Sequence, residues 1–459
     1  MPYNDGLEHR FCLFPMMPRV FEHLHTLIQL WKHPRADRKS IIRFQNRKLR
    51  SVISYAYKNL PYYRQLFDRY GISPDDIKTV DDISIIPITS SQDFRNRPVE
   101  ETISREAKLH RMVQRHTSGS TGRPFTIRRT PLEDHLINSF RIRSHRRFGV
   151  KIRDVRVSIE FTSQSHRRDN LLGAIRQFLG IYRVYSINCL GSAADIASEL
   201  EEIGPDIISG FPEILSHVAQ YLTKEDRTIH PRFVITGGES LTPFRKQKIE
   251  NGFKCKAFDI YGSHEFNVLA WACPDTGQYH VCDDNVIVEV LRNGRQAEPG
   301  ERGEVVATGL NCYAMPFIRY RLGDVVTQGT SMCSCGQPFS TIRNIQGRMH
   351  DYFIMPDGSL LHPDNIIVPV MENESSWIDQ YQILQEKEDR VVLRIHPFHS
   401  PDETQLRHVK QLARAQLPSN VKFSIDIVDN LAFETSGKFR FCRSLVNSKC
   451  DDIDWENLA

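Results

Sequence analysis

The sequence predicts an α/β protein. A large N-terminal domain, with sheets flanked by helices plus a β-rich segment, precedes a small C-terminal α+β domain. Three observations predict this: short apolar runs alternate with helical patterns from about residue 110, β-type runs dominate after about 280, and strand, strand, helix and strand follow from about 348. The 459 residues, 40% of them hydrophobic, suffice for more than one core. We therefore expect domains at 1–347 and 348–459.

Helical patterns fill residues 18–70 and are interrupted at Pro61, which predicts a break between two helices. The segment VFEHLHTLIQLW is apolar on one helical face only and is too short to span a bilayer. The polar, proline-broken stretch before it does not resemble a signal peptide. We expect no membrane span and a cytoplasmic protein whose ten cysteines are reduced.

The alternating region predicts a sheet with helices on its faces. Helical patterns such as SAADIASELEEIG and PEILSHVAQYL follow most of the apolar runs. Sheets of this kind bind ligands at the carboxyl ends of their strands. The predicted strands are VRVSIEF (155–161), RVYSIN (183–188), PDIISGFP (205–212), RFVITGGE (232–239) and KAFDIYG (256–262).

The segment after residue 280 carries VIVEVL, GEVVATGL and DVVTQG, with Asn293 and Gly294 as a hairpin turn. The C-terminal part carries DYFIMPDGSLLHPDNI, DQYQILQEKEDRVVLRIHP, a helical DETQLRHVKQLARAQL and finally VKFSIDIVDN. This division into a large and a small domain predicts a cleft between them.

The charge balance argues against a nucleic-acid partner. Lys and Arg number 60 against 56 Asp and Glu, a net charge of +4 without a concentrated basic stripe. The basic cluster RIRSHRR at 141–147 has helix-like spacing and predicts a solvated helix face. Nothing in the sequence predicts the oligomeric state.

The stretch HTSGSTGRP, residues 116–124, has two interpretations. Its composition alone favours a flexible linker. However, it stands between two extended runs, and successive small residues leave N–H groups and hydroxyls free to converge on an anion. It is not a Walker loop, because the lysine of that motif is missing.

Four later motifs offer side chains that suit a nucleotide site. In YGSHE, the end of a strand presents Tyr261 to stack on a base and Glu265 to hold a hard cation such as Mg²⁺. In IRYRLGD, Asp324 follows a Gly turn and can accept hydrogen bonds from paired ribose hydroxyls. QGRMHD supplies Arg348 and ETSGKFR supplies Lys438. Taken singly, each motif is also typical of an ordinary turn.

In their order and combination the motifs are specific. HTSGSTGRP, ITGGESL, YGSHEF, MPFIRYRLGD, NIQGR and SGKFR resemble the adenylate-forming (acyl-CoA synthetase) superfamily, specifically its phenylacetate-CoA ligase-like and CapK-like capsule polysaccharide branch. The N-terminal VISYAYKNLPYYRQLF also resembles that branch, so the resemblance covers most of the chain. It implies a large ATP- and acyl-binding domain and a small mobile domain that carries the catalytic lysine.

The resemblance also implies a role for each motif residue. Lys438, Glu265 and Arg348 would be catalytic: Lys438 would bridge the carboxylate oxygen and the α-phosphate, and Glu265 would hold Mg²⁺. Asp324, assisted by Arg348, would bind the ribose. The other implied ATP- or AMP-binding residues are Ser118, Gly119, Ser120, Thr121 and Gly122 at the β- and γ-phosphates, Gly238, Glu239 and Tyr261 at the adenine, and Gly262.

Two positions depart from the family pattern. The family hinge lies two residues after the motif arginine and is typically Asp or Lys; here that residue is His350, with Asp351 next to it. Phe125 stands where many superfamily members have lysine, so the loop would hold phosphate mainly through its backbone and hydroxyl groups.

The implied reaction is ATP-dependent activation of a carboxylic acid, an aryl or small organic acid, to an acyl-adenylate with release of pyrophosphate, followed by transfer to coenzyme A. ATP, Mg²⁺ and coenzyme A are therefore expected. Two alternatives stay open: transfer to an amine, a sugar or a carrier protein, and a catalytically silent relative acting as a binding subunit. The intact Lys438, Glu265 and Asp324 argue against the silent relative.

The cysteines predict a second site. CPDTGQYHVC provides a Cys, a His and a second Cys, and MCSCGQP provides a Cys-x-Cys-Gly turn. Thiolates and an imidazole match a closed tetrahedral zinc site, and some members of the resembled branch carry zinc in this region. We expect a structural Zn²⁺ on Cys273, His280, Cys333 and Cys335, with Cys282 as the alternative ligand.

Overall fold

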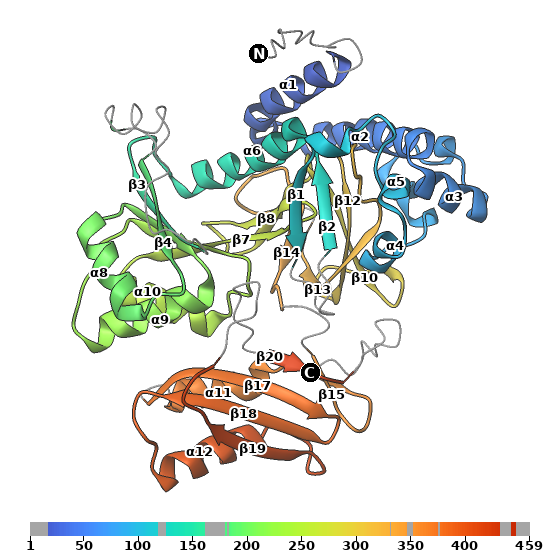
Figure 1. The fold of residues 1–459 in the computed structure, drawn as a ribbon. Helices are drawn as coiled ribbons and strands as arrows, with labels where there is room; N and C mark the ends of the chain where they lie inside the picture. Colours follow the sequence, from blue (N-terminus) through green and yellow to red (C-terminus); the bar gives the residue numbers. More distant parts are fainter. Residues whose placement is uncertain are drawn as a thin grey trace, which may run out of the picture.

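The computed structural model describes residues 17–117, 125–160, 180, 183–330, 332–346, 352–374, 377–431 and 442–446. No helix in these ranges combines the length and the apolar character needed to cross a bilayer. Figure 1 shows a large upper part, blue to yellow, and a smaller orange part below it.

Three helices open the described chain: α1 (Met17–Lys32), α2 (Arg38–Asn59) and α3 (Pro61–Tyr70). The predicted break at Pro61 is confirmed, because this residue is the first of α3. The Asp37 carboxylate caps α2 by accepting a hydrogen bond from the N–H of Ser40 at 2.6 Å. Gly71, with φ +66°, ends α3 in the left-handed conformation.

A twelve-stranded sheet forms the centre of the large part, in the order β11-β10-β12-β13-β14-β9-β8-β7-β6-β5-β3-β4. The β-rich segment therefore continues the same sheet as the alternating region, because β7 pairs antiparallel with β8. Within the part of the sheet that runs from β7 to β4, adjacent strands are parallel to one another. They are β3 (Val155–Glu160), β4 (Arg183–Asn188), β5 (Ile207–Gly210), β6 (Phe233–Gly237) and β7 (Lys256–Ser263).

Helices α8 (Ala193–Ile203), α9 (Pro212–Lys224) and α10 (Pro243–Phe253) lie against this parallel half (Figure 1). Val157 and Ile208 of the sheet are fully buried and share one core with Val218 of α9. The strand and helix alternation predicted from the sequence is therefore confirmed.

The antiparallel half packs a second core against α2 and α3, which includes Tyr63, Phe67 and Trp271. Asn293 and Gly294 both have positive φ and join β10 to β11, as a two-residue hairpin turn requires. The strands are β8 (Asn267–Ala272), β9 (Tyr279–Val281), β10 (Val286–Arg292), β11 (Arg295–Gln296), β12 (Arg302–Gly309), β13 (Tyr320–Gln328) and β14 (Thr341–Arg343).

A separate hairpin of β1 (Val113–Thr117) and β2 (Phe125–Arg129) flanks the Ser/Gly-rich loop, with Thr117 paired to Phe125. The two extended runs predicted on either side of that loop are therefore present, whereas residues 118–124 lie outside the described ranges. The chain continues into α6 (Pro131–Phe148), which a Thr130/Glu133 capping box begins. The remaining short helices of this part are η1 (His33–Arg35), η2 (Pro74–Asp76), η3 (Val80–Ile85), α4 (Ser91–Arg95), α5 (Val99–Thr102) and η4 (Leu109–Arg111).

The C-terminal part has a core of its own, which includes the fully buried Phe353 and Trp377. Its sheet has the order β19-β18-β17-β20. The predicted strands and helix are present, and an additional helix, α11 (Asp364–Glu374), follows the first of the predicted strand segments. The boundary expected between 347 and 348 stays a prediction. The elements are β15 (Phe353–Ile354), β16 (Leu360–Leu361), α11 (Asp364–Glu374), β17 (Ile378–Lys387), β18 (Arg390–Pro397), α12 (Glu403–Arg414), β19 (Lys422–Ile427) and β20 (Cys442–Ser444).

Candidate active site

The end of β6 and the loop that follows it pack closely against neighbouring groups. A side chain at Gly237 would meet the carbonyl oxygen of Ile260 at 2.9 Å. Gly238 has φ +84°, and a Cβ there would lie 3.0 Å from the Phe211 ring. Both positions therefore favour glycine, because a side chain there would collide with neighbouring backbone or with the Phe211 ring. The next residue, Glu239, accepts a hydrogen bond from the N–H of Glu213 at 3.4 Å.

Tyr261 and Asp324 are hydrogen-bonded to each other. The Tyr261 hydroxyl, near the end of β7, donates to Oδ2 of Asp324 at 2.5 Å. Asp324 directly follows Gly323 and lies inside β13; its role as a ribose ligand stays a prediction. Gly323 has φ +77°, and the β12/β13 register shifts between Glu304 and Val306, so the strand bends there without ending.

Glu265 follows β7 and is half-buried. Its Oε1 accepts a hydrogen bond from the Tyr320 hydroxyl at 3.1 Å. Its main-chain oxygen accepts one from Nη2 of Arg129 at 2.8 Å. Arg129 also donates to the main-chain oxygen of His264. The carboxylate expected to hold Mg²⁺ is thus fixed at its backbone and at one oxygen.

Sequence reasoning missed both of these supporting residues. Tyr320 stands inside the quoted motif IRYRLGD, and Arg129 closes the strand that follows the Ser/Gly-rich loop. Arg129 and Arg115 both pair with Asp134, at 3.4 and 2.8 Å. Burial opposes ionisation of Asp134, but the hydrogen bond and charge of Arg115, aided by Arg129, lower the pKa of this carboxyl. The β1–β2 hairpin is thereby tied to the Glu265 turn.

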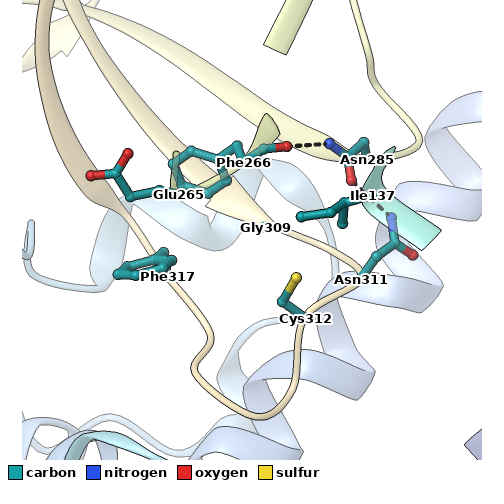
Figure 2. Close-up of a pocket in the computed structure, with 8 residues that line it drawn as sticks. All are labelled: Ile137, Glu265, Phe266, Asn285, Gly309, Asn311, Cys312 and Phe317. Carbon is teal, nitrogen blue, oxygen red and sulfur yellow. Dashed lines mark hydrogen bonds between the residues drawn. The ribbon is translucent and has the colours of Figure 1, made fainter. Parts of the chain in front are cut away.

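A small pocket lies beside Glu265 (Figure 2), and hydrogen bonds hold its two asparagines. Nδ2 of Asn285 donates to the main-chain oxygen of Phe266 at 2.9 Å, and Nδ2 of Asn311 donates to Oδ1 of Asn285 at 3.3 Å. Burial raises the pKa of the Cys312 thiol to about 12. We assign this pocket to support of the Glu265 turn, since its thiol is neutral and not nucleophilic. Its lining is Ile137, Glu265, Phe266, Asn285, Gly309, Asn311, Cys312 and Phe317.

Gly262 lies beside this turn, where a Cβ would meet the main-chain oxygen of Asn267 at 2.2 Å. Several predicted site residues lie outside the described ranges, so their roles stay predictions. They are Ser118, Gly119, Ser120, Thr121, Gly122, Arg348, His350 and Lys438.

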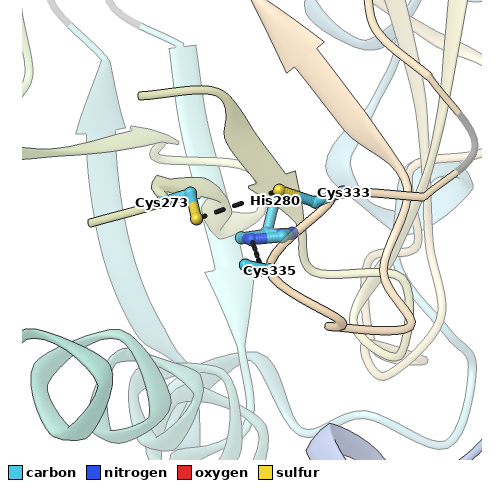
Figure 3. Close-up of side chains that lie close together, drawn as sticks. All are labelled: Cys273, His280, Cys333 and Cys335. Atoms are coloured by element: carbon cyan, nitrogen blue, oxygen red, sulfur yellow. Dashed lines mark hydrogen bonds between the residues drawn. The ribbon is translucent and has the colours of Figure 1, made fainter. Parts of the chain in front are cut away.

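The four predicted zinc ligands lie together, and their side chains point toward one another (Figure 3). One potential ligand atom from each of Cys273, His280, Cys333 and Cys335 lies within 4.8 Å of the others. Cys273 follows β8, His280 is in β9, and the other two stand in the β13–β14 connection. The tight turn there needs Gly336, with φ +80°, whose N–H donates to the main-chain oxygen of Cys333.

The chemistry of this cluster fits a zinc ion. Three thiols and one imidazole form a common tetrahedral ligand set. Burial, with a smaller contribution from Arg147, lowers the pKa of His280 to about 4, so the ring is neutral and has a lone pair to donate. The alternative ligand, Cys282, is fully buried outside this group, and burial raises the pKa of its thiol.

Comparisons with known proteins agree with these motifs. The sequence profile of the CapK C-terminal domain family matches residues 353–444. A phenylacetate-coenzyme A ligase of Pseudomonas putida is 27% identical over 330 residues, which cover 68% of this chain and 71% of the relative. Protein CapK of Staphylococcus aureus is 21% identical over 416 residues, covering 87% and 88%.

The fold is also found in solved ligase structures. A 2-hydroxyisobutyryl-CoA ligase in the postadenylation state, in complex with R3-HIB-AMP, has a TM-score of 0.70 at 20% identity, covering 88% of this chain and 89% of that chain. The same ligase in the thioesterification state has a TM-score of 0.59 at 20% identity, with the same coverage. The C-terminal part therefore matches the CapK C-terminal domain family, and the chain as a whole is similar to phenylacetate-CoA ligases and to CapK in sequence and to CoA ligases in fold.

Proposed function

We propose that the protein uses ATP to activate a carboxylic acid as an acyl-adenylate, releases pyrophosphate, and transfers the acyl group to coenzyme A. The observation that carries this proposal is the pairing of two motifs, in which Tyr261 binds Asp324 and Tyr320 binds Glu265. This pairing brings together two motifs whose groups suit a base, a ribose and a cation. Relatives named phenylacetate-CoA and 2-hydroxyisobutyryl-CoA ligases support an aryl or small organic acid as the substrate.

The first half-reaction needs positioning and charge neutralisation. A carboxylate oxygen forms a bond to the α-phosphorus of ATP, and the bond to pyrophosphate breaks. The loop at Gly238 and the Tyr261/Asp324 pair would hold the nucleoside, and loop 118–122 would hold the outer phosphates. Lys438 would neutralise charge where the two anions meet.

Mg²⁺ fits the turn at Glu265. This ion usually takes one or two protein carboxylates and completes its shell with phosphate oxygens and water. Glu265 offers a fixed carboxylate for that arrangement, and Mg²⁺ would supply neutralisation of the phosphate charge. In the second half-reaction the thiol of coenzyme A attacks the acyl carbon, loses its proton, and AMP leaves.

We further propose a structural zinc ion on Cys273, His280, Cys333 and Cys335. Four protein ligands leave no open coordination position, which favours a structural role over a catalytic one. Free thiols and a nucleotide-dependent reaction support the cytoplasm as the site of action.

The proposal is tested by carboxylate-dependent pyrophosphate exchange, screened over aryl, alkyl and amino acids with and without coenzyme A. We expect exchange with one acid class, thioester formation when coenzyme A is present, and loss of both in Glu265→Gln. Exchange without thioester would favour an amine, sugar or carrier protein as the acceptor. Absence of exchange with every acid class would favour a silent binding subunit.

A further inference from the structure

Tyr320 is held rigidly in the described structure. Its side chain is 3% exposed, and its backbone pairs with Ala307 of β12 and bridges to Thr89. Its ring lies 4.9 Å from the Phe317 ring, between centroids, and 6.0 Å from that of Phe94. A buried ring packed in this way has few available rotamers, so the direction of its hydroxyl group is fixed.

This hydroxyl donates to Oε1 of Glu265 at 3.1 Å. This hydrogen bond uses Oε1, so Oε2 is the oxygen that would bind a cation, and rotation about the terminal torsion of the carboxylate is restrained. Arg129, the last residue of β2, donates to the main-chain oxygen of Glu265 and so fixes the backbone of that residue. Mg²⁺ demands near-ideal octahedral geometry, so the direction of the ligand oxygen decides how well the ion is bound.

We propose that Tyr320 is a positioning residue, which orients the Glu265 carboxylate for the divalent cation that accompanies ATP. This inference rests on the proposed function, because it takes Glu265 as the cation ligand. A purely packing role would make the hydroxyl dispensable for cation binding. The nearby Tyr63 is an example of such a packing role, because its hydroxyl is bonded to main-chain groups. It accepts a hydrogen bond from the N–H of Ile318 and donates one to the main-chain oxygen of Pro316.

The test compares Tyr320→Phe with the matched control Tyr63→Phe. Both substitutions remove one buried, hydrogen-bonded hydroxyl from the aromatic cluster around Phe94. Binding of Mn²⁺, used as a probe for Mg²⁺, is measured by electron paramagnetic resonance in the presence of ATP. A hydrogen bond to a charged group predicts about tenfold weaker Mn²⁺ binding in Tyr320→Phe. Tyr63→Phe should bind Mn²⁺ as the wild type does.

The Mg²⁺ dependence of pyrophosphate exchange gives a second measurement. Tyr320→Phe should need about tenfold more Mg²⁺ for half-maximal exchange and approach wild-type rates at saturation. In a Glu265→Gln background, Tyr320→Phe should weaken Mn²⁺ binding no further. The inference would be overturned if Tyr320→Phe weakened Mn²⁺ binding equally in the wild-type and Glu265→Gln backgrounds. It would also be overturned if Tyr320→Phe left the Mn²⁺ affinity unchanged. Wild-type protein that shows no exchange would instead count against the proposed function.

Discussion

Asp259 is a single buried carboxyl group that joins three strands of the central sheet. It is 3% exposed, and it accepts hydrogen bonds from the Thr236 hydroxyl of β6 at 2.6 Å and the Tyr279 hydroxyl of β9 at 2.9 Å. Burial disfavours the charged form more than these two donors favour it, and the pKa of Asp259 rises to about 6. Its charge state therefore influences stability at mildly acidic pH.

We expect this carboxyl to make the folded state less stable as pH rises from about 4 to 6. Between its unfolded and folded pKa values the folded state binds more protons, so the free energy of unfolding falls with increasing pH. Relative to wild type, Asp259→Asn should gain at most about 3 kcal/mol over this window, because the amide does not ionise. Urea unfolding at pH 4.5 and 7.5 measures this change, with the exposed Asp81→Asn as control. Parallel pH profiles for wild type and Asp259→Asn would contradict the expectation.

The residues of the proposed site could be identified from the sequence, but their hydrogen-bond partners could not, because these partners are distant in the chain. Tyr261, Glu265 and Asp324 were identifiable because short motifs signal them. Their supports were not: Tyr320 and Glu265 are 55 residues apart, and Arg129 and Glu265 are 136 residues apart. A motif specifies only the type of each residue. The register of β13 and the path of β2 determine that the Tyr320 hydroxyl and the Arg129 guanidinium both reach Glu265.

At the scale of elements, β14 joins the strands around the cysteine cluster by very short ladders. It pairs two residues with β13 and two with β9. A zinc ion on Cys273, His280, Cys333 and Cys335 would tie the β13–β14 connection to β8 and β9 by metal bonds. Metal binding of this kind contributes directly to folding free energy.

We therefore expect stoichiometric zinc in protein purified without chelator, and a fall in Tm of about 5 °C or more when zinc is removed. Cys335→Ala should lose the metal and show a similar fall. Cys255→Ala is the control, because this cysteine is outside the cluster. Metal analysis and thermal unfolding with and without chelator measure both effects. The structural role would be refuted if the purified protein contained no zinc, or if removal of zinc left the Tm unchanged.

Helix α11 shows why some elements escaped prediction. Pro369 inside it and several β-branched residues favour non-helical structure locally. The buried residues Ile366, Ile367, Val370 and Met371 nevertheless recur at helical spacing and pack in the C-terminal core. Tertiary burial thus overrides local propensity. The continuity of the twelve-stranded sheet also depends on pairings between distant segments, which no local pattern encodes.

At the scale of the whole molecule, a buried cluster connects the large part to the C-terminal part. Arg245 of α10 pairs with Glu213 at 2.7 Å, and its Nη2 donates to the Tyr381 hydroxyl of β17 at 3.2 Å. Burial opposes ionisation of Glu213, but the charge of Arg245, followed by His217, lowers its pKa to about 2. Arg245 also donates to the main-chain oxygen of Ser240, which stands two residues after Gly238. The loop after β6 and the C-terminal part thus share one guanidinium.

Tyr381→Phe tests whether this contact favours adenylation. The hydrogen bond between Arg245 and Tyr381 joins the two parts in the arrangement that the structure describes. Loss of a hydrogen bond specific to that arrangement should lower the adenylation rate relative to acyl transfer by about fivefold. Pyrophosphate exchange and thioester formation from supplied acyl-adenylate measure the two rates. Tyr57→Phe, which removes a hydroxyl bonded to Asp68 far from the interface, should leave the ratio unchanged. A ratio unchanged in Tyr381→Phe would mean that the contact does not select a conformation.

Lys438→Ala tests the proposed alternation between two arrangements. If the C-terminal part rotates between half-reactions, Lys438 meets the α-phosphate only during adenylation and leaves the site before transfer. Removal of a positive charge where two anions meet should cost about a hundredfold or more in exchange rate. Transfer from supplied acyl-adenylate to coenzyme A should change far less. The control is Lys422→Ala, an exposed lysine of β19 in the same part of the chain. Equal losses in both half-reactions would place Lys438 at the site throughout, and a fixed domain arrangement would then explain the chemistry better.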